Sequence, residues 1–135
     1  MTVNGRHLPR VLLFEQHFVM RRTIVSVARE LGVAQIQDAS TIERARAMLA
    51  TDTFEGVVLD CDDAAKTIEL LAELRLGRFS SPRDAPVIVM AAALRRSDEE
   101  QLQALAVSDV LRKPFKIGDL LRAFASRAPN GLRNG

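Results

Sequence analysis

The sequence contains no tryptophan, no tyrosine and a single cysteine, Cys61. A lone cysteine cannot form a disulfide bridge within the chain, which is typical of proteins from a reducing compartment, so we expect a cytoplasmic protein. The six phenylalanines are the only aromatic residues, whereas proteins that bind single-stranded nucleic acid stack bases on many aromatic side chains. Long apolar runs are also missing, and residues 1–10 are too polar for a signal peptide, so we expect no contact with a membrane.

The charge is close to balanced, with 19 basic and 17 acidic residues. Sixteen of the basic residues are arginine, and they are scattered in pairs, such as Arg21–Arg22 and Arg95–Arg96, rather than gathered in one run. This pattern gives no specific support for nucleic-acid binding. A chain of 135 residues with 47% hydrophobic content predicts one compact domain. We expect this domain over residues 9–128, with tails over residues 1–8 and 129–135.

Apolar patterning predicts five strands that alternate with five helices. The strands are expected at residues 11–14, 34–38, 56–59, 87–90 and 110–111. Gly32 is expected to end the first helix, and Ser40 with Glu43 and Ser97 with Glu100 have the spacing of capping boxes. This alternation predicts an α/β fold in which a parallel sheet is covered by helices on both faces.

The carboxyl ends of the strands are the first places to search for function, because ligands of open α/β sheets bind there. Glu15 and Gln16 follow the first strand, Asp60 the third, Ala91 the fourth and Lys113 the fifth. The sequence shows no pairing of a nucleophile with a base and no glycine-rich phosphate loop. We therefore expect a protein that is not an enzyme.

The order and spacing of these residues resemble the receiver domain of two-component response regulators over about residues 9–127. In that family an acidic pair follows strand one, a phosphoacceptor aspartate follows strand three, a hydroxyl residue follows strand four and Lys-Pro follows strand five. This sequence has Leu59-Asp60 after an apolar strand, the run Pro86-Val-Ile-Val-Met, and Lys113-Pro114-Phe115. The resemblance implies a flavodoxin-like (βα)5 doubly wound sandwich, with a five-stranded parallel sheet of order 2-1-3-4-5. It also implies that Asp60 is the phosphoacceptor and that Lys113 contacts the phosphate.

Several positions depart from the family pattern. The acidic pair is Glu15-Gln16, so one carboxylate is longer than usual and the other is replaced by a neutral amide. The hydroxyl after strand four is replaced by Ala91, and the next two residues are also alanine. The aromatic switch position is Val110, and the small Gly-Ala pair ahead of strand five is replaced by Ala106-Val107. These changes predict a degenerate receiver in which phosphorylation and its transmission are both impaired.

The resemblance implies a Mg²⁺ site formed by Glu15, Asp60 and Asp62, the last through its backbone carbonyl. The neutral Gln16 removes a charge, so we expect the site to be weak or absent. Glu15 is expected either to compensate in part for this loss or to reach across to Lys113 in place of the metal. The side chain of Asp62 or that of Asp63 is expected to restore some negative charge. Loss of the hydroxyl donor is expected to slow phosphoryl transfer on the order of 10²-fold.

Together these features predict an atypical stand-alone receiver in two-component or phosphorelay signalling, with slow or absent phosphorylation of Asp60. Its output is expected to be protein–protein contact through residues 96–106, 110–112 and 116–127. The implied partners are a histidine kinase or phosphotransfer protein and a downstream protein target. The sequence leaves open whether the chain is a monomer or a dimer.

Two alternatives remain open at this stage. One is a pseudo-receiver that binds its partner without being phosphorylated. The other is a receiver fold that binds an anionic nucleotide such as cyclic-di-GMP through arginines, for which the candidates are Arg21, Arg22, Arg95 and Arg96. His17 has only His7 as a second histidine in the chain, so we do not expect a histidine metal cluster.

Overall fold

The computed structural model describes residues 2–3 and 6–126. Its main sheet is parallel, with strand order β4-β3-β5-β6-β7. The strands are β3 (Arg10–Phe14), β4 (Gln35–Ala39), β5 (Gly56–Asp60), β6 (Val87–Ala91) and β7 (Asp109–Arg112). The helices are α1 (Phe18–Leu31), α2 (Ile42–Thr51), α3 (Ala64–Arg75), α4 (Arg96–Ala104) and α5 (Ile117–Ser126). Counted along the chain, this sheet has the order 2-1-3-4-5, so the predicted flavodoxin-like fold is confirmed.

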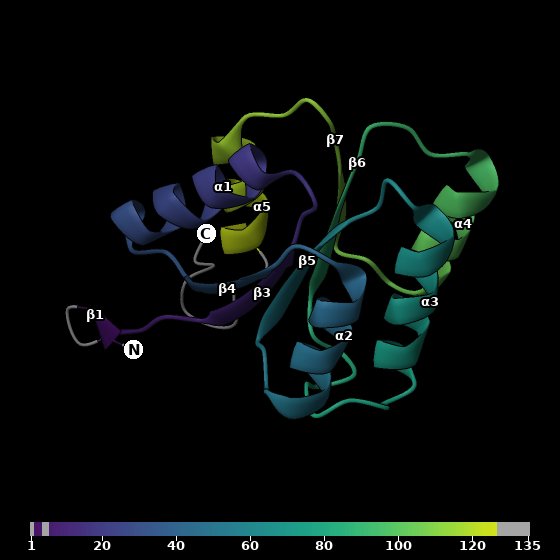
Figure 1. The fold of residues 1–135 in the computed structure, drawn as a ribbon, viewed down its shortest axis with the longest axis horizontal. Coiled ribbons are helices and arrows are strands. Elements are labelled where there is room, and N and C mark those ends of the chain that lie inside the picture. Colours follow the sequence, from purple (N-terminus) through teal and green to yellow (C-terminus); the bar gives the residue numbers. More distant parts are fainter. Residues whose placement is uncertain (1, 4–5, 127–135) are drawn as a thin grey trace.

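The helices form one layer on each side of the sheet (Figure 1). Helices α1 and α5 cover one face, and α2, α3 and α4 cover the other. Alternate strand residues enter two separate cores, so that Leu12 and Leu59 pack under α2–α4 whereas Leu13 and Val58 pack under α1 and α5. Every residue of β5 and β6 is buried. The two central strands therefore hold the residues at their carboxyl ends in fixed positions.

Helix boundaries confirm one sequence prediction and correct two. Gly32 ends α1 in the left-handed conformation with φ of 62°, as expected from the sequence. The predicted capping box at Ser40 is wrong by one residue, because the N-cap of α2 is Thr41, whose Oγ1 accepts from the backbone N–H of Arg44 at 3.1 Å. The error arose because serine and threonine cap helices almost equally well.

The predicted start of α4 is also wrong. Ser97 is already inside the helix, and the N-cap is Arg95. The carboxylate of Asp98 accepts from the backbone N–H of Arg95 at 3.2 Å, so the acidic residue at the third helical position satisfies the first turn. None of the described helices is both long enough and apolar enough to cross a lipid bilayer.

The first residues of the chain contain a short antiparallel ladder that the sequence did not predict. Strand β1 (Thr2–Val3) pairs with β2 (Arg6–His7). His7 Nε2 lies 2.8 Å from Glu55 Oε1, which also accepts from the backbone N–H of Arg10 at 3.1 Å. Within the segment expected as a tail over residues 1–8, His7 therefore contacts the residue that precedes β5. The second expected tail, residues 129–135, lies outside the described residues.

The guanidinium of Arg75, at the end of α3, joins two loops near the amino ends of β6 and β7. It donates to the carbonyl oxygens of Arg83 and Ala85 at 2.8 and 2.7 Å. It also donates to those of Leu105 and Ala106 at 2.8 and 3.2 Å. Ala106 itself has φ of 60°, a left-handed conformation that favours glycine. This one side chain therefore fixes the loop before β6 and the turn before β7.

Candidate functional site

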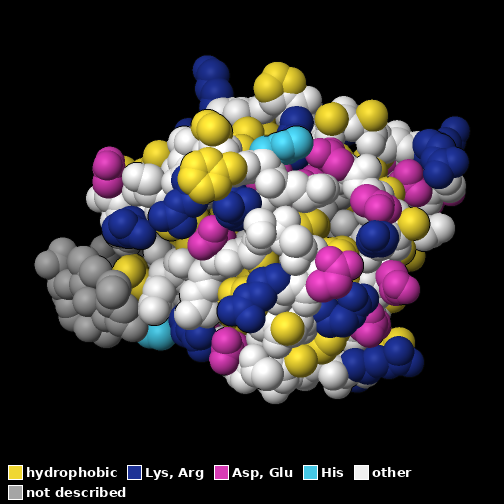
Figure 2. Space-filling model, in the orientation of Figure 1, with side chains coloured by type: hydrophobic (Ala, Val, Ile, Leu, Met, Phe, Trp, Pro, Cys, Tyr) yellow, Lys and Arg dark blue, Asp and Glu magenta, His cyan; other side chains and the backbone are white. Residues whose placement is uncertain are grey.

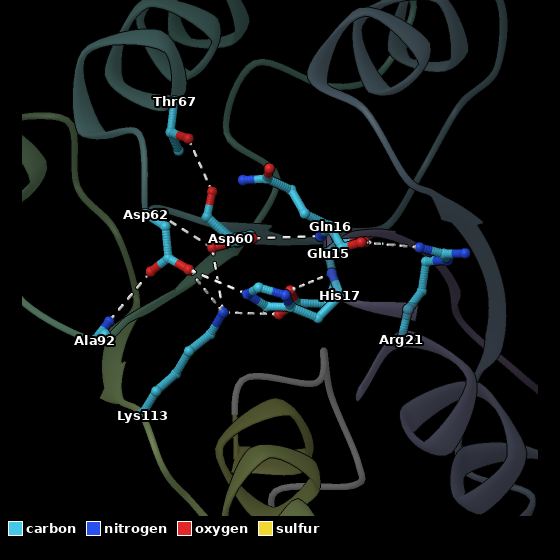
Figure 3. A network of polar contacts seen from close by, with 9 residues as sticks. All are labelled: Glu15, Gln16, His17, Arg21, Asp60, Asp62, Thr67, Ala92 and Lys113. Atoms are coloured by element: carbon cyan, nitrogen blue, oxygen red, sulfur yellow. Dashed lines mark hydrogen bonds and ion pairs between the residues drawn. The ribbon is translucent and has the colours of Figure 1, made fainter. Parts of the chain in front are cut away.

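Four charged side chains predicted from the sequence meet at the carboxyl edge of the sheet (Figure 3). Glu15 follows β3, Asp60 ends β5, Asp62 lies in the loop after β5, and Lys113 follows β7. The ammonium of Lys113 is at the centre of the group. Its Nζ lies 2.9 Å from Glu15 Oε1, 3.3 Å from Asp60 Oδ1 and 3.4 Å from Asp62 Oδ2. We call these four residues the carboxylate cluster.

Burial makes the ion pairs of Lys113 strong. The side chains of Glu15 and Asp60 are 0% exposed and that of Lys113 is 12% exposed. Burial of the ammonium disfavours its charge, but the hydrogen bond with Glu15 and the attraction of Asp60, Glu15 and Asp62 outweigh this effect. The pKa of Lys113 is therefore raised above its ordinary value.

The carboxylate of Asp60 is oriented by backbone donors. Its Oδ2 accepts from the backbone N–H of Gln16 at 3.3 Å, and its Oδ1 accepts from that of Asp62 at 3.1 Å. The Oγ1 of Thr67 in α3 donates to the backbone carbonyl of Asp60 at 2.8 Å. Nothing in the sequence indicated this contact, because Thr67 lies inside α3 and does not directly follow a strand.

Glu15 reaches across the site to Lys113, the second of the two roles expected for it. Its Oε1 contacts the ammonium, and its Oε2 accepts from the backbone N–H of His17 at 3.0 Å. Arg21 donates to the backbone carbonyl of Glu15 at 3.1 Å, which fixes the residue at the end of β3. Both carboxylate oxygens of Glu15 are thus already engaged.

Asp62 adds its side chain to the site. Its Oδ1 accepts from the backbone N–H of Ala92 at 3.3 Å, and His17 Nε2 lies 3.8 Å from its Oδ2. Partial burial raises the pKa of Asp62, but the Ala92 amide and Lys113 outweigh burial, so the pKa lies below its ordinary value. Asp62 therefore adds a third carboxylate to the contacts of Lys113.

Gln16 itself does not contribute its amide to the cluster. The residue is exposed, and Figure 3 shows its side chain directed away from Lys113. It lines a cleft between the amino-terminal ends of α2 and α3, together with residues such as Thr41 and Lys66. Only its backbone N–H serves the site, by donating to Asp60.

The residues present do not fit a Mg²⁺ ion in this arrangement. Among residues 2–3 and 6–126, no group of three or more His, Cys, Asp or Glu side chains is arranged to hold a metal. The oxygens of Glu15 and Asp60 that would be ligands face Lys113. Mg²⁺ requires octahedral oxygen ligands at about 2.0–2.1 Å, and the ammonium lies between these oxygens instead.

The positions at which the resemblance predicts a hydroxyl and an aromatic residue are apolar. Ala91 ends β6 and is fully buried, and its carbonyl accepts from the backbone N–H of Lys113 at 2.9 Å. Ala92 and Ala93 are exposed. Val110 in β7 is half-buried. None of these side chains offers a hydroxyl or an aromatic ring to follow a phosphoryl group.

Cys61 lies next to Asp60, but its environment disfavours the reactive thiolate. The side chain is fully buried, and burial, together with the negative charges of Asp98, Asp60 and Asp62, raises the pKa of the thiol to about 12. The thiolate that would react is therefore scarce at neutral pH.

The arginines proposed for nucleotide binding are not brought together. Arg21 is bonded to Asp38 at 2.9 Å, and Arg22 lies 3.7 Å from the same carboxylate. Arg95 and Arg96 lie 3.8 and 3.7 Å from acidic residues of their own helix, Asp98 and Glu100. Helices α1 and α4 lie on opposite faces of the sheet (Figure 1). The two pairs do not form one anion-binding surface.

Comparison with known proteins finds similarity only at the level of structure. No model of a protein family matches the chain, and no curated protein matches it. The structure is similar to a signal receiver domain of a histidine kinase from Clostridium thermocellum, with a TM-score of 0.76 and 17% identity over 87% of this chain and 95% of that chain. It is also similar to the chemotaxis protein CheY4 of Vibrio cholerae, with a TM-score of 0.75 and 16% identity over 87% of this chain and 97% of that chain.

A third similar structure is the receiver domain of a sensor histidine kinase from Pseudomonas aeruginosa, which holds a magnesium ion in its active-site cleft. The TM-score is 0.69 and the identity is 23%, over 86% of this chain and 93% of that chain. At these identities the likeness establishes architecture rather than activity. The similarity nevertheless extends over most of both chains in all three cases. The chain therefore has the fold of a response-regulator receiver domain.

Proposed function

We propose that this chain is a non-enzymatic receiver module of two-component or phosphorelay signalling, in which Asp60 is a phosphoacceptor with impaired kinetics. The observation that carries the proposal is the position of Asp60. Its carboxylate lies at the carboxyl end of the central strand β5, held by two backbone N–H groups and 3.3 Å from the ammonium of Lys113. This arrangement supplies an oriented nucleophile next to a cation.

The chemistry would be transfer of a phosphoryl group from a donor to one carboxylate oxygen of Asp60. A new P–O bond forms to Asp60 while the bond from phosphorus to the leaving group breaks, and the donor leaves with the electron pair. Lys113 would neutralise one phosphate oxygen. No side-chain hydroxyl follows β6 to bind a second oxygen, so the transfer should be slow by on the order of 10²-fold.

The charge of the carboxylate cluster also slows the transfer. Three carboxylates surround one ammonium, so an incoming phosphate meets net negative charge. A histidine kinase or phosphotransfer protein would have to overcome this repulsion through its own contacts. Phosphorylation by such a partner is therefore expected to be slower than in receivers with an intact site.

The output is proposed to be protein–protein contact through the surface formed by α4, β7 and α5. An ion pair between Glu99 of α4 and Arg112 of β7, 2.5 Å apart, joins two elements of this surface. Ala91 and Val110 lack the groups that would move with a phosphate, so the surface is expected to respond weakly to phosphorylation.

A second candidate is a pseudo-receiver that binds its downstream partner in one fixed state. The ion pair between Glu15 and Lys113 favours it, because this contact holds Lys113 in place in the unmodified chain. In that case Asp60→Asn would leave partner binding intact.

Intact-mass measurement after incubation with acetyl phosphate tests the primary proposal. The native chain should gain one phosphoryl group slowly, over minutes to hours, whereas Asp60→Asn should gain none. Complete modification of the native chain within seconds would contradict the impaired kinetics. Absence of any modification, also with a kinase as donor, would leave only the pseudo-receiver.

A further inference from the structure

The carboxylate cluster contains more negative than positive charge. Three carboxylates converge, two of them fully buried, and the described residues place a single ammonium among them. Buried carboxylates require a positive partner to remain ionised. The relevant question is whether that partner is a bound metal or a residue of the chain.

We propose that Glu15 is a positioning residue that holds Lys113 as the built-in cation of the cluster, in the place that a divalent metal would otherwise take. The inference rests on the proposed function only in identifying the cluster as the phosphoacceptor site. It concerns the unmodified chain and predicts that Mg²⁺ is not a ligand of this protein.

The side chain of Glu15 is long enough to contact Lys113 from the end of β3. Its Oε1 makes the shortest of the three contacts with Lys113, at 2.9 Å, and among the described residues this buried oxygen has no hydrogen-bond partner that competes with the ion pair. A glutamate is one methylene longer than an aspartate, so an aspartate at this position would not span the same gap. The departure from the family pattern at residue 15 therefore has a physical consequence: it ties the end of β3 to the residue after β7.

Space and charge give the second argument. The ammonium lies within 3.4 Å of one oxygen from each of Glu15, Asp60 and Asp62. A Mg²⁺ ion bound to these oxygens of Glu15 and Asp60 at about 2.0–2.1 Å would lie against the ammonium, and the two cations would repel each other. To bind the metal through these two oxygens, the chain would have to break the ion pairs of Lys113 with Glu15 and Asp60.

The position of Gln16 gives the third argument. In the family pattern this residue would be a second carboxylate of the acidic pair, but here it is neutral and its side chain is directed away from the cluster (Figure 3). The replacement charge comes from Asp62, whose Oδ2 faces Lys113 rather than an open coordination position. The carboxylate that residue 16 lacks is thus supplied by Asp62, at a position where it contacts Lys113.

An exposed histidine borders the outer side of the site. Figure 2 shows that acidic, basic and apolar side chains are interspersed over the face of the molecule in this view. The side chain of His17 is 68% exposed, and its Nε2 lies 3.8 Å from Asp62 Oδ2. His17 therefore borders the one carboxylate of the cluster that solvent reaches.

The test is an NMR titration of the native chain with MgCl₂ from 0 to 20 mM at constant ionic strength, without a phosphodonor. The backbone amides of Gln16, Asp62 and Ala92 report on the site. Two variants are compared with the native chain. Glu15→Asp with Gln16→Asp restores two short carboxylates and releases Lys113, whereas Gln16→Asp alone adds a carboxylate but leaves Glu15 on Lys113.

We expect no saturable shift in the native chain, and at least a tenfold tighter Mg²⁺ affinity in the double variant than in Gln16→Asp alone. Saturation of the native chain with a dissociation constant below about 1 mM would overturn the inference. Equal affinities of the two variants would overturn it as well, because release of Lys113 would then make no difference.

A second measurement keeps the inference testable if the double variant does not fold. The titration of the Lys113 side chain, followed by NMR, should move to lower pH in Glu15→Gln than in the native chain, with no such change in the exposed Lys116. An unchanged titration of Lys113 would show that Glu15 does not hold it. A chain that is never phosphorylated yet passes both tests contradicts the proposed function and leaves this inference intact.

Discussion

Two cations hold opposite edges of the same sheet, and they do so in different ways. Lys113 at the carboxyl edge contacts three carboxylates, two of them fully buried. Among the described residues, Arg75, near the amino ends of β6 and β7, donates to four backbone carbonyls and to no carboxylate. The first contact depends on groups that titrate and the second on groups that do not. The contacts at the carboxyl edge therefore depend on the protonation of carboxylates, whereas those at the amino edge involve neutral carbonyls and only fix the loops.

Removal of Lys113 should have the largest effect. We expect Lys113→Met to lower the free energy of unfolding at pH 7 by about 3 to 5 kcal/mol, because Glu15 and Asp60 would remain buried without a counter-charge. Urea denaturation followed by circular dichroism measures this change. The exposed Lys116 provides the control, since Lys116→Met should change stability by less than about 0.5 kcal/mol. A similar small change for both variants would show that the cluster does not depend on its lysine.

Arg75→Met should destabilise the chain less, by about 2 to 3 kcal/mol, because the carbonyls it leaves are neutral and partly reached by water. Arg78 lies on the exposed surface nearby, and Arg78→Met is the matched control. Hydrogen exchange should show faster opening of residues 83–86 and 105–108 in Arg75→Met, with the amides around Asp60 unchanged. Faster exchange at the carboxyl edge instead would mean that the two edges are coupled.

The contributions of Lys113 and Arg75 to stability should depend differently on pH. The pKa of Lys113 is raised in the folded chain, so its contribution to stability is fully present below the ordinary lysine pKa of 10.5 and is lost as pH rises through the higher folded value. The stability gap between the native chain and Lys113→Met should therefore shrink above pH 10.5. Urea midpoints at pH 7, 9.5 and 11 test this. Between pH 9.5 and 11 the gap between the native chain and Arg75→Met should change less, because the pKa of arginine is ordinarily 12.5.

The smallest effect is expected at Ala106, within the turn that Arg75 holds. Because Ala106 has φ of 60°, Ala106→Gly should relieve backbone strain and raise the free energy of unfolding by about 0.5 to 1 kcal/mol. Thermal unfolding measures the gain. A loss of stability in Ala106→Gly would show that this turn does not keep its left-handed conformation in solution.

The sequence predicted the sheet and the cluster for a common reason. Buried strands such as residues 56–59 are continuous apolar runs, and the carboxyl ends of parallel strands meet at one edge, so Glu15, Asp60 and Lys113 had to converge. Contacts made by residues inside helices were not predictable in this way. Thr67 has no strand-end signal, although its hydroxyl binds the carbonyl of Asp60.

The contacts of Arg75 and the buried face of α1 could not be predicted, because the local sequence fits more than one arrangement. Arg75 has the position of an ordinary solvated arginine at a helix end, and only the fold reveals the carbonyls around it. Leu31, in the last turn of α1, is 62% exposed, whereas Val25 is buried. Both residues are apolar, so tertiary packing decides which of them enters the core.

The ion pair between Glu15 and Lys113 has a kinetic consequence. It joins the ends of β3 and β7, which are the first and last strands of the main sheet in the chain and have β5 and β6 between them. The contact can form only after all four strands are in place, so it should be absent from the transition state for folding. Its loss in Lys113→Met should therefore accelerate unfolding and leave the folding rate almost unchanged. In this chain, the residues that would receive a signal also set how long the native state survives.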